Sequence, residues 1–158
     1  MSEEQILKKI LYSIKTIGVK MLEKLLNKII QGKMFLNNEL LDIDEDYVLD
    51  LRDKPEFEKE WLRIFNKFEN TELTETEVLL INKIREQSFL AVYNITGSDE
   101  LAGYISDDFE IIAKGIITKF NDSWLNSFML SYTNYKIPYG ELENTNLQIE
   151  DIIKKLVN

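Results

Sequence analysis

Hydrophobic and polar residues follow one another along the chain with the three- and four-residue spacing of amphipathic helices. The first thirty residues carry the longest apolar stripe, formed by Ile6, Leu7, Ile10, Leu11, Ile14, Ile17, Met21, Leu22, Leu25, Leu26, Ile29 and Ile30. Ser2 and Gln5 are spaced as a capping box, in which each side chain satisfies a free backbone amide of the first turn. The pattern therefore predicts one long helix, or two abutting helices, over residues 2–31, with Gly32 as the C-cap.

Five further helices are predicted by the same spacing and by their capping residues. A proline in the first turn favours one start, a capping box of Thr74 and Glu77 another, and Ser98 a third. The predicted helices cover residues 55–68, 74–96, 98–117, 121–136 and 149–156. Residues 33–54 lack clear periodicity, and residues 135–142 can hold a short extended piece. We therefore expect an all-α fold, an irregular bundle or array of about six helices, in one domain over residues 1–158.

Composition removes several kinds of catalysis. The chain contains no cysteine and no histidine, so disulfides, thiolate nucleophiles, serine–histidine pairs and His-ligated metals are all excluded. Its six glycines are scattered singly and form no phosphate-binding loop. We expect no enzyme activity and no cofactor.

The first residues lack the pattern of a secretory signal, and no apolar run approaches the roughly eighteen residues that span a bilayer. A cytoplasmic location is therefore expected.

The net charge of −9 is unevenly distributed. Residues 1–34 hold seven lysines against three glutamates, whereas residues 35–60 hold ten acids against three bases. An acidic surface repels nucleic acid, whose binding depends on neutralised phosphates, so the expected partner is a basic protein. The basic first helix could lie on an anionic membrane, but a solvated face of a core helix explains its lysines more simply, and we expect no membrane partner.

The acids of residues 42–53 fall on five positions of a calcium-loop template. Tyr47 occupies the place of the turn glycine, and Asp53 is shorter than the closing glutamate, so we assign no metal there. The alternative is an acid-rich surface for a basic partner, which makes Asp42, Asp44 and Asp46 candidate contacts. Asp107, Asp108 and Glu110 form a second acidic group; acid–base chemistry by such a pair is possible, but surface charge is the favoured interpretation.

Aromatic residues gather in the C-terminal half, where they comprise Tyr104, Phe109, Phe120, Trp124, Phe128, Tyr132, Tyr135 and Tyr139. Phe109, Trp124 and Phe128 fall on apolar helix faces and are expected in the core. The last three tyrosines lie near a helix end and the break at Pro138 and Gly140. Tyrosine offers contact area with a polar tip, so Tyr132, Tyr135 and Tyr139 are candidate interface residues.

Residues 100–142 resemble the C-terminal part of small bacterial immunity proteins. The resemblance rests on Tyr104-Ile-Ser-Asp107-Asp108-Phe, Trp124-Leu125, Tyr132 and Pro138-Tyr-Gly140-Glu141. Such proteins are cytoplasmic inhibitors encoded beside contact-dependent or polymorphic toxins, many of which are basic nucleases. The resemblance implies a non-enzymatic inhibitor that blocks the active site of a cognate toxin. The implied contacts are Asp107, Asp108, Glu110, Tyr132, Tyr135 and Tyr139, with Asp42, Asp44 and Asp46 as a second patch.

Two other functions fit the sequence. A helical adaptor or regulatory protein would share the acidic surface and the interface tyrosines. A carboxylate-dependent enzyme that uses a metal ion would need acids that converge on one site. The sequence leaves the oligomeric state open.

Overall fold

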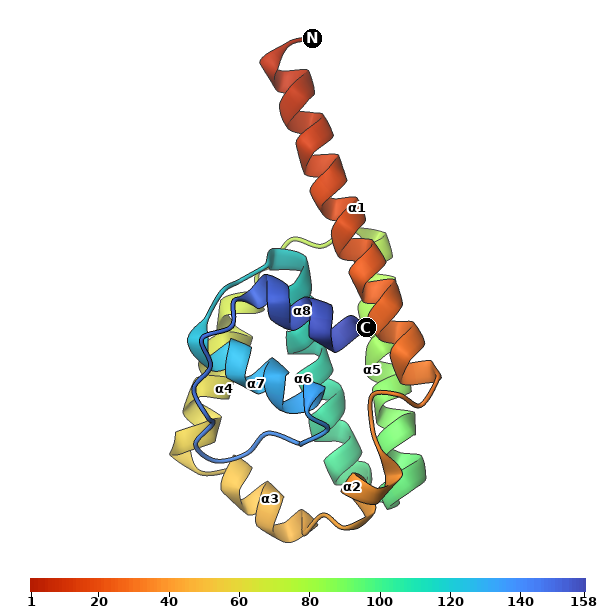
Figure 1. Ribbon diagram of the computed structural model, residues 1–158, viewed down its shortest axis with the longest axis vertical. Coiled ribbons are helices and arrows are strands. Elements are labelled where there is room, and N and C mark those ends of the chain that lie inside the picture. Colours follow the sequence, from red (N-terminus) through yellow and green to blue (C-terminus); the bar gives the residue numbers. More distant parts are fainter.

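The computed structural model describes the backbone of residues 1–158 and the side chains of residues 1–13 and 16–158. Within this part of the chain all regular elements are helices (Figure 1). Their bounds are α1 Glu3–Ile30, α2 Asn37–Leu41, α3 Glu45–Arg52, α4 Pro55–Phe68, α5 Glu75–Thr96, α6 Asp99–Thr118, α7 Ser123–Thr133 and α8 Ile149–Val157. The all-α class is confirmed, while the expected number of about six helices is too low by two. The expectation of a single domain stays a prediction.

The two additional helices, α2 and α3, lie in the acidic segment that shows no clear periodicity. Asp44 starts α3 by accepting a hydrogen bond from the amide of Tyr47 at 3.2 Å. The helix turns Val48, Leu49 and Arg52 into the protein interior. These three positions have helical spacing, but the third is an arginine. In a helix of only eight residues, one charged residue on the buried side is enough to hide the apolar pattern. The sequence therefore does not reveal this helix.

Helix α1 begins with the predicted capping box of Ser2 and Gln5. Its second half packs against α5, α6 and α8, and Leu22, Leu25 and Ile29 are buried there. Its first half projects beyond the rest of the molecule (Figure 1). The expected apolar stripe therefore enters the core only in its second half. The side chain of Ile14, which belongs to the predicted stripe, lies outside the described residues.

Among the described residues, helix α6 contributes more buried side chains than any other helix, and it packs along α5. The predicted core positions Leu101, Ile105, Phe109, Ile112 and Ile116 are all buried. Helix α7 crosses α6 closely at Gly115, where an added Cβ would lie 3.3 Å from the side chain of Leu125. The aromatic side chains of α4 and α7 complete the core, with Phe57 and Phe128 buried and Trp124 packed against both.

Helix α7 ends at Thr133, three residues before the predicted end. Tyr135 then adopts a positive φ of 60°, which turns the chain out of the helix. Residues 134–148, here called the C-terminal loop, run from this turn to α8 without regular structure, so the expected extended piece over 135–142 is not a strand. Helix α8 then returns the chain to α1, where Lys28 donates a hydrogen bond to the carbonyl of Leu156 at 2.8 Å. None of the described helices combines the length and apolar character needed to cross a bilayer.

Candidate functional site

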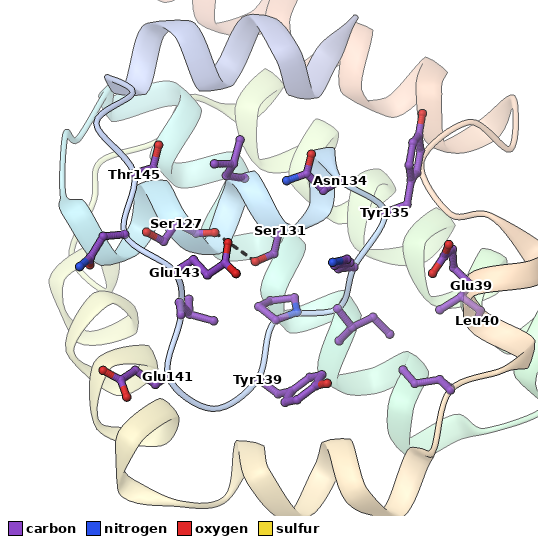
Figure 2. Close-up of a pocket in the computed structure, with 17 residues that line it drawn as sticks. Glu39, Leu40, Ser127, Ser131, Asn134, Tyr135, Tyr139, Glu141, Glu143 and Thr145 are labelled. Atoms are coloured by element: carbon purple, nitrogen blue, oxygen red, sulfur yellow. Dashed lines mark hydrogen bonds between the residues drawn. The ribbon is translucent and has the colours of Figure 1, made fainter.

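A groove lies between the C-terminal loop, α7 and α2. Its volume is about 550 Å³. Figure 2 shows the loop passing around two sides of the groove, with Ser127 and Ser131 of α7 at its centre and Glu39 and Leu40 of α2 on the far side. The groove is open to solvent and could receive a side chain or a short segment of another protein.

The groove is acidic. Glu39, Glu141 and Glu143 line it, against one basic residue, Lys136. Glu143 extends across the groove towards Ser131 (Figure 2). All three glutamates are exposed to solvent.

Three of the candidate acids adjoin the same groove. Asp42 and Asp44 flank Ile43, which lines it, and Asp46 precedes Tyr47, whose ring packs against Tyr139 at the groove edge. All three aspartates are exposed. We call Glu39, Asp42, Asp44, Asp46, Glu141 and Glu143 together the acidic face.

Two of the candidate tyrosines line the groove. Tyr135 and Tyr139 are partly exposed, and the ring of Tyr139 meets that of Tyr47 edge to face with centroids 5.9 Å apart. The structure thus joins the second predicted patch, Asp42 to Asp46, to two of the three predicted interface tyrosines. Aromatic side chains provide contact area, and the neighbouring acids provide charge. Protein interfaces gain much of their affinity from such combinations.

A buried ion pair fixes part of the groove wall from the protein interior. Both terminal nitrogens of Arg52 bond the carboxylate of Asp108, Nη2 to Oδ1 at 2.6 Å and Nη1 to Oδ2 at 2.9 Å. Nη1 also donates to the carbonyl of Pro138 at 3.0 Å, which ties the C-terminal loop to α3 and α6. Trp61 Nε1 and the hydroxyl of Tyr132 donate to the same carboxylate. One carboxylate therefore joins four separate segments of the chain.

Electrostatics in this cluster favour the ion pair. Burial by itself opposes the charge of Arg52, but the adjacent charge and hydrogen bonds of Asp108 outweigh it and raise the pKa of the guanidinium. Burial, reinforced by the charge of Asp108, raises the pKa of Tyr132 well above its usual value. The hydroxyl of Tyr132 therefore stays protonated and acts as a donor.

The burial of this cluster corrects two candidate contacts. Asp108 is 0% exposed and Tyr132 is 2% exposed, so a partner cannot touch either side chain on the folded protein. Both fall on the core stripes of their helices, Asp108 between Ile105 and Ile112 and Tyr132 four residues after Phe128. Their role is to anchor the scaffold.

Asp107 and Glu110 lie apart from the groove and have internal partners. Arg85 of α5 bonds Asp107 at 2.7 Å and Glu110 at 3.4 Å, and Lys114 lies 4.0 Å from Glu110. Two acids and two bases leave this region electrically balanced. Partial burial raises the pKa of Asp107, although Arg85 acts in the opposite direction. These acids offer much less net charge to a basic partner than the acidic face does.

The segment proposed as an alternative calcium loop folds differently. Residues 45–52 form α3, so the acids of this segment are spread along a helix, and Asp44 is engaged as its N-cap. Among the described residues, no three acids are clustered closely enough to hold a metal ion. The loop geometry that calcium requires is therefore not formed.

A family model described as Immunity protein PIM1 matches residues 24–139. The match covers more than half of the chain. This chain belongs to the PIM1 family of immunity proteins. The expected resemblance to immunity proteins is thereby confirmed, and the match reaches from residue 139 back to residue 24, far before the expected start at residue 100. No curated protein matches the chain significantly.

The PIM1 match includes α2, α3 and most of the tyrosine side of the groove, but it ends before Glu141 and Glu143. It also begins after the projecting half of α1. The buried anchor lies entirely within the match, since Arg52, Trp61, Asp108 and Tyr132 fall between residues 24 and 139. The scaffold of the groove therefore lies within the region that the family model matches.

Sequence analysis missed the groove glutamates and the buried arginine. Glu39 precedes the acidic segment by three residues, and Glu141 and Glu143 follow the Pro-Tyr-Gly break that had drawn attention to the tyrosines. A signal for Arg52 was present, because it lies three and four residues after Leu49 and Val48. A lone arginine on an apolar stripe requires a buried acid, and Asp108 on the stripe of the predicted helix 98–117 is the matching one.

Proposed function

We propose that this PIM1-family protein binds a cognate protein toxin through the acidic face and neutralises it by covering the toxin active site. The observation that carries the proposal is the charge imbalance of the acidic face: three exposed glutamates line the groove with two partly exposed tyrosines and a single lysine, and three exposed aspartates adjoin it. A basic segment of the toxin would enter the groove, with Tyr135 and Tyr139 as its apolar contacts.

The proposed toxin is a nuclease. A nuclease must bind phosphates, so the surface around its active site is basic, and the acidic face is complementary to such a surface. Complementary charge accelerates the encounter of two proteins and selects against partners of the wrong sign. Inhibition by occlusion requires no chemistry from the inhibitor, so the proposal includes no catalytic residue, cofactor or metal, and it places the protein in the cytoplasm.

Rigidity of the groove supports inhibition. The Arg52–Asp108 pair fixes Pro138, and Asn121 and Asn126 fix the far end of the C-terminal loop through bonds to Gln148, Leu147 and Ile149. A loop that is already ordered loses little conformational entropy when it binds. The groove is therefore prepared for a tight complex.

The test uses the purified protein and the product of the gene adjacent to its own. Binding is measured by calorimetry, and inhibition is measured as loss of the nuclease activity of that product. The groove variant Glu39→Lys/Glu141→Lys/Glu143→Lys should lose binding and protection. A matched variant, Glu23→Lys/Glu69→Lys/Glu72→Lys, makes the same change in net charge at exposed sites on α1 and after α4, and it should retain both.

The outcomes separate the competing functions. If both variants lose binding, net charge alone attracts the partner. If neither variant loses binding, the groove is not the binding site. An adjacent gene product that does not bind, together with capture of a shared cellular protein through the groove, indicates a helical adaptor. A rise in melting temperature with magnesium or calcium favours a carboxylate-dependent enzyme.

A further inference from the structure

The first half of α1 is an apolar surface exposed to water. We call residues 3–17 the arm, which extends beyond the body of the molecule (Figure 1). Five of its aliphatic side chains are between 44% and 59% exposed: Ile6, Leu7, Ile10, Leu11 and Ile17. At 1.5 Å per residue the arm is about 22 Å long, about four turns of helix.

The exposed aliphatic residues lie along one side of the arm. Successive residues of a helix are about 100° apart, which places these five side chains within a sector of about 140°. Lys8 and Lys9 fall outside that sector, and Lys8 pairs with Glu4 at 3.4 Å. A stripe of this width is typical of a helix that packs against a neighbour.

The body also exposes apolar side chains near the base of the arm. The start of α5 lies beside the middle of α1, and its Val78 and Leu79 are 41% and 63% exposed (Figure 1). The PIM1 match begins at residue 24, so the arm lies outside the matched region. The acidic face lies on other elements, and the occupant of the arm is a separate question from the toxin.

We propose that the arm pairs with the arm of a second copy of this chain, with the two helices antiparallel. Leu7, Ile10 and Ile17 follow one another at intervals of three and seven residues, which is the spacing of a coiled-coil seam. Ile6 and Leu11 flank the seam. Two arms together cover about 1,000 Å² of surface, about the lower limit for a specific interface between proteins.

The position of the body determines the antiparallel orientation. Each arm joins its body at the C-terminal end, so parallel arms would bring two bodies side by side, each of which belongs to a chain with net charge −9. Antiparallel arms place the bodies at opposite ends of the pair. They also place Glu3 and Glu4 at the start of one arm near Lys20 of the other copy. The two helix dipoles then point in opposite directions, which is the favourable arrangement. The register places Leu7 of one copy opposite Ile17 of the other.

The first experiment measures the mass of the full chain by sedimentation at micromolar and higher concentrations. The wild type should sediment as a dimer, and Leu7→Glu/Ile10→Glu should sediment as a monomer with an unchanged helical spectrum, because both side chains lie outside the core. The control Lys9→Glu/Tyr12→Glu introduces the same number of glutamates on the outer side of the arm and should remain a dimer. A monomeric wild type, or a dimer that survives in the seam variant, overturns the proposal.

The second experiment tests the orientation and uses the absence of natural cysteine. Leu7→Cys and Ile17→Cys are made in separate chains of different tagged length and oxidised alone and mixed. A disulfide that forms only in the mixture supports antiparallel arms, whereas one that forms in Leu7→Cys alone shows parallel arms and overturns the orientation. A wild type that is monomeric and sediments with phosphatidylserine vesicles assigns the arm to a lipid surface instead.

Discussion

The acidic face of the groove and the carboxylates of α6 carry similar residues and have different physical roles. On the acidic face the acids are exposed, and a single lysine lines the groove beside them. On α6 three carboxylates have an arginine partner, Arg52 for Asp108 and Arg85 for Asp107 and Glu110. The charge of a paired carboxylate is neutralised by a base of the same chain, whereas the charge of an unpaired carboxylate can attract a partner. Carboxylates of the first kind should control stability, and those of the second kind should control binding.

The largest expected effect is on folding. Asp108→Asn keeps the shape of the side chain but leaves the buried charge of Arg52 without its partner, which should lower the free energy of unfolding by about 3–5 kcal/mol. Urea denaturation measures the change. Asp107→Asn is the neighbouring control and should alter stability by less than about 1 kcal/mol, because its ion pair is partly exposed. Equal losses in the two variants would show that burial does not distinguish these acids.

The second effect is on binding. Glu39→Lys/Glu141→Lys/Glu143→Lys should weaken toxin affinity by about a hundredfold, because close charge pairs across an interface couple by several kcal/mol. Asp107→Asn/Glu110→Gln should weaken it by less than about threefold, since rim charges with other partners contribute little. Calorimetry gives both affinities. A larger loss in the α6 variant would reverse the comparison and return the interface to the acids that the sequence resemblance had favoured.

A smaller effect concerns the tyrosines of the groove. Tyr139→Ala removes an aromatic side chain from the proposed interface and should reduce toxin affinity by about tenfold. Tyr12→Ala on the arm removes an equally large and more exposed ring, and it should leave the affinity unchanged. The dissociation rate is the informative measurement, because apolar anchors act mainly on the lifetime of a complex. Similar effects from the two tyrosines would place the toxin outside the groove.

The smallest effect tests a paired acid by pH. Burial favours a higher pKa for Asp122, but its bonds with Arg63 and with the amide of Leu125 outweigh burial and lower the pKa. A lowered carboxylate pKa adds stability above the ordinary aspartate range, and this contribution is lost as the pH falls through the lowered value. Asp122→Asn should therefore cost about 0.5 kcal/mol at neutral pH and nothing in strong acid. Denaturation curves at several pH values measure the difference, and a cost that persists in acid would assign it to the cap alone.

Long helices could be predicted from the sequence because their caps and stripes agree. Ser2 and Gln5, Thr74 and Glu77, and Ser98 all form the expected caps. Helix α3 could not be predicted in the same way, because it is short and its inward side includes Arg52. The acidity of its surface suggested a loop. Local spacing therefore describes helices well where burial is apolar, and poorly where a charge is buried with a distant partner.

The candidate site could be predicted only in part, for a related reason. The exposed positions agree with the expectation for Asp42, Asp44 and Asp46 and for Tyr135 and Tyr139. That these residues meet at one groove depends on contacts between α3 and the C-terminal loop. Asp107 and Asp108 are adjacent in sequence, and a rotation of about 100° around the helix axis separates a partly exposed acid from a buried one. The spacing of Ile105, Asp108 and Ile112 contains that information, but charge composition obscures it.

The buried anchor beneath the groove has a consequence for how binding specificity can change. The C-terminal loop is fixed from the interior by the cluster of Arg52, Asp108 and Tyr132. Its outward side chains are therefore not needed to hold the loop in place. Exposed residues away from such anchors usually tolerate substitution within about 0.5 kcal/mol. The residues that face a partner can therefore be exchanged one after another while the fold persists. Substitutions confined to this surface would therefore change what the protein binds without changing its fold.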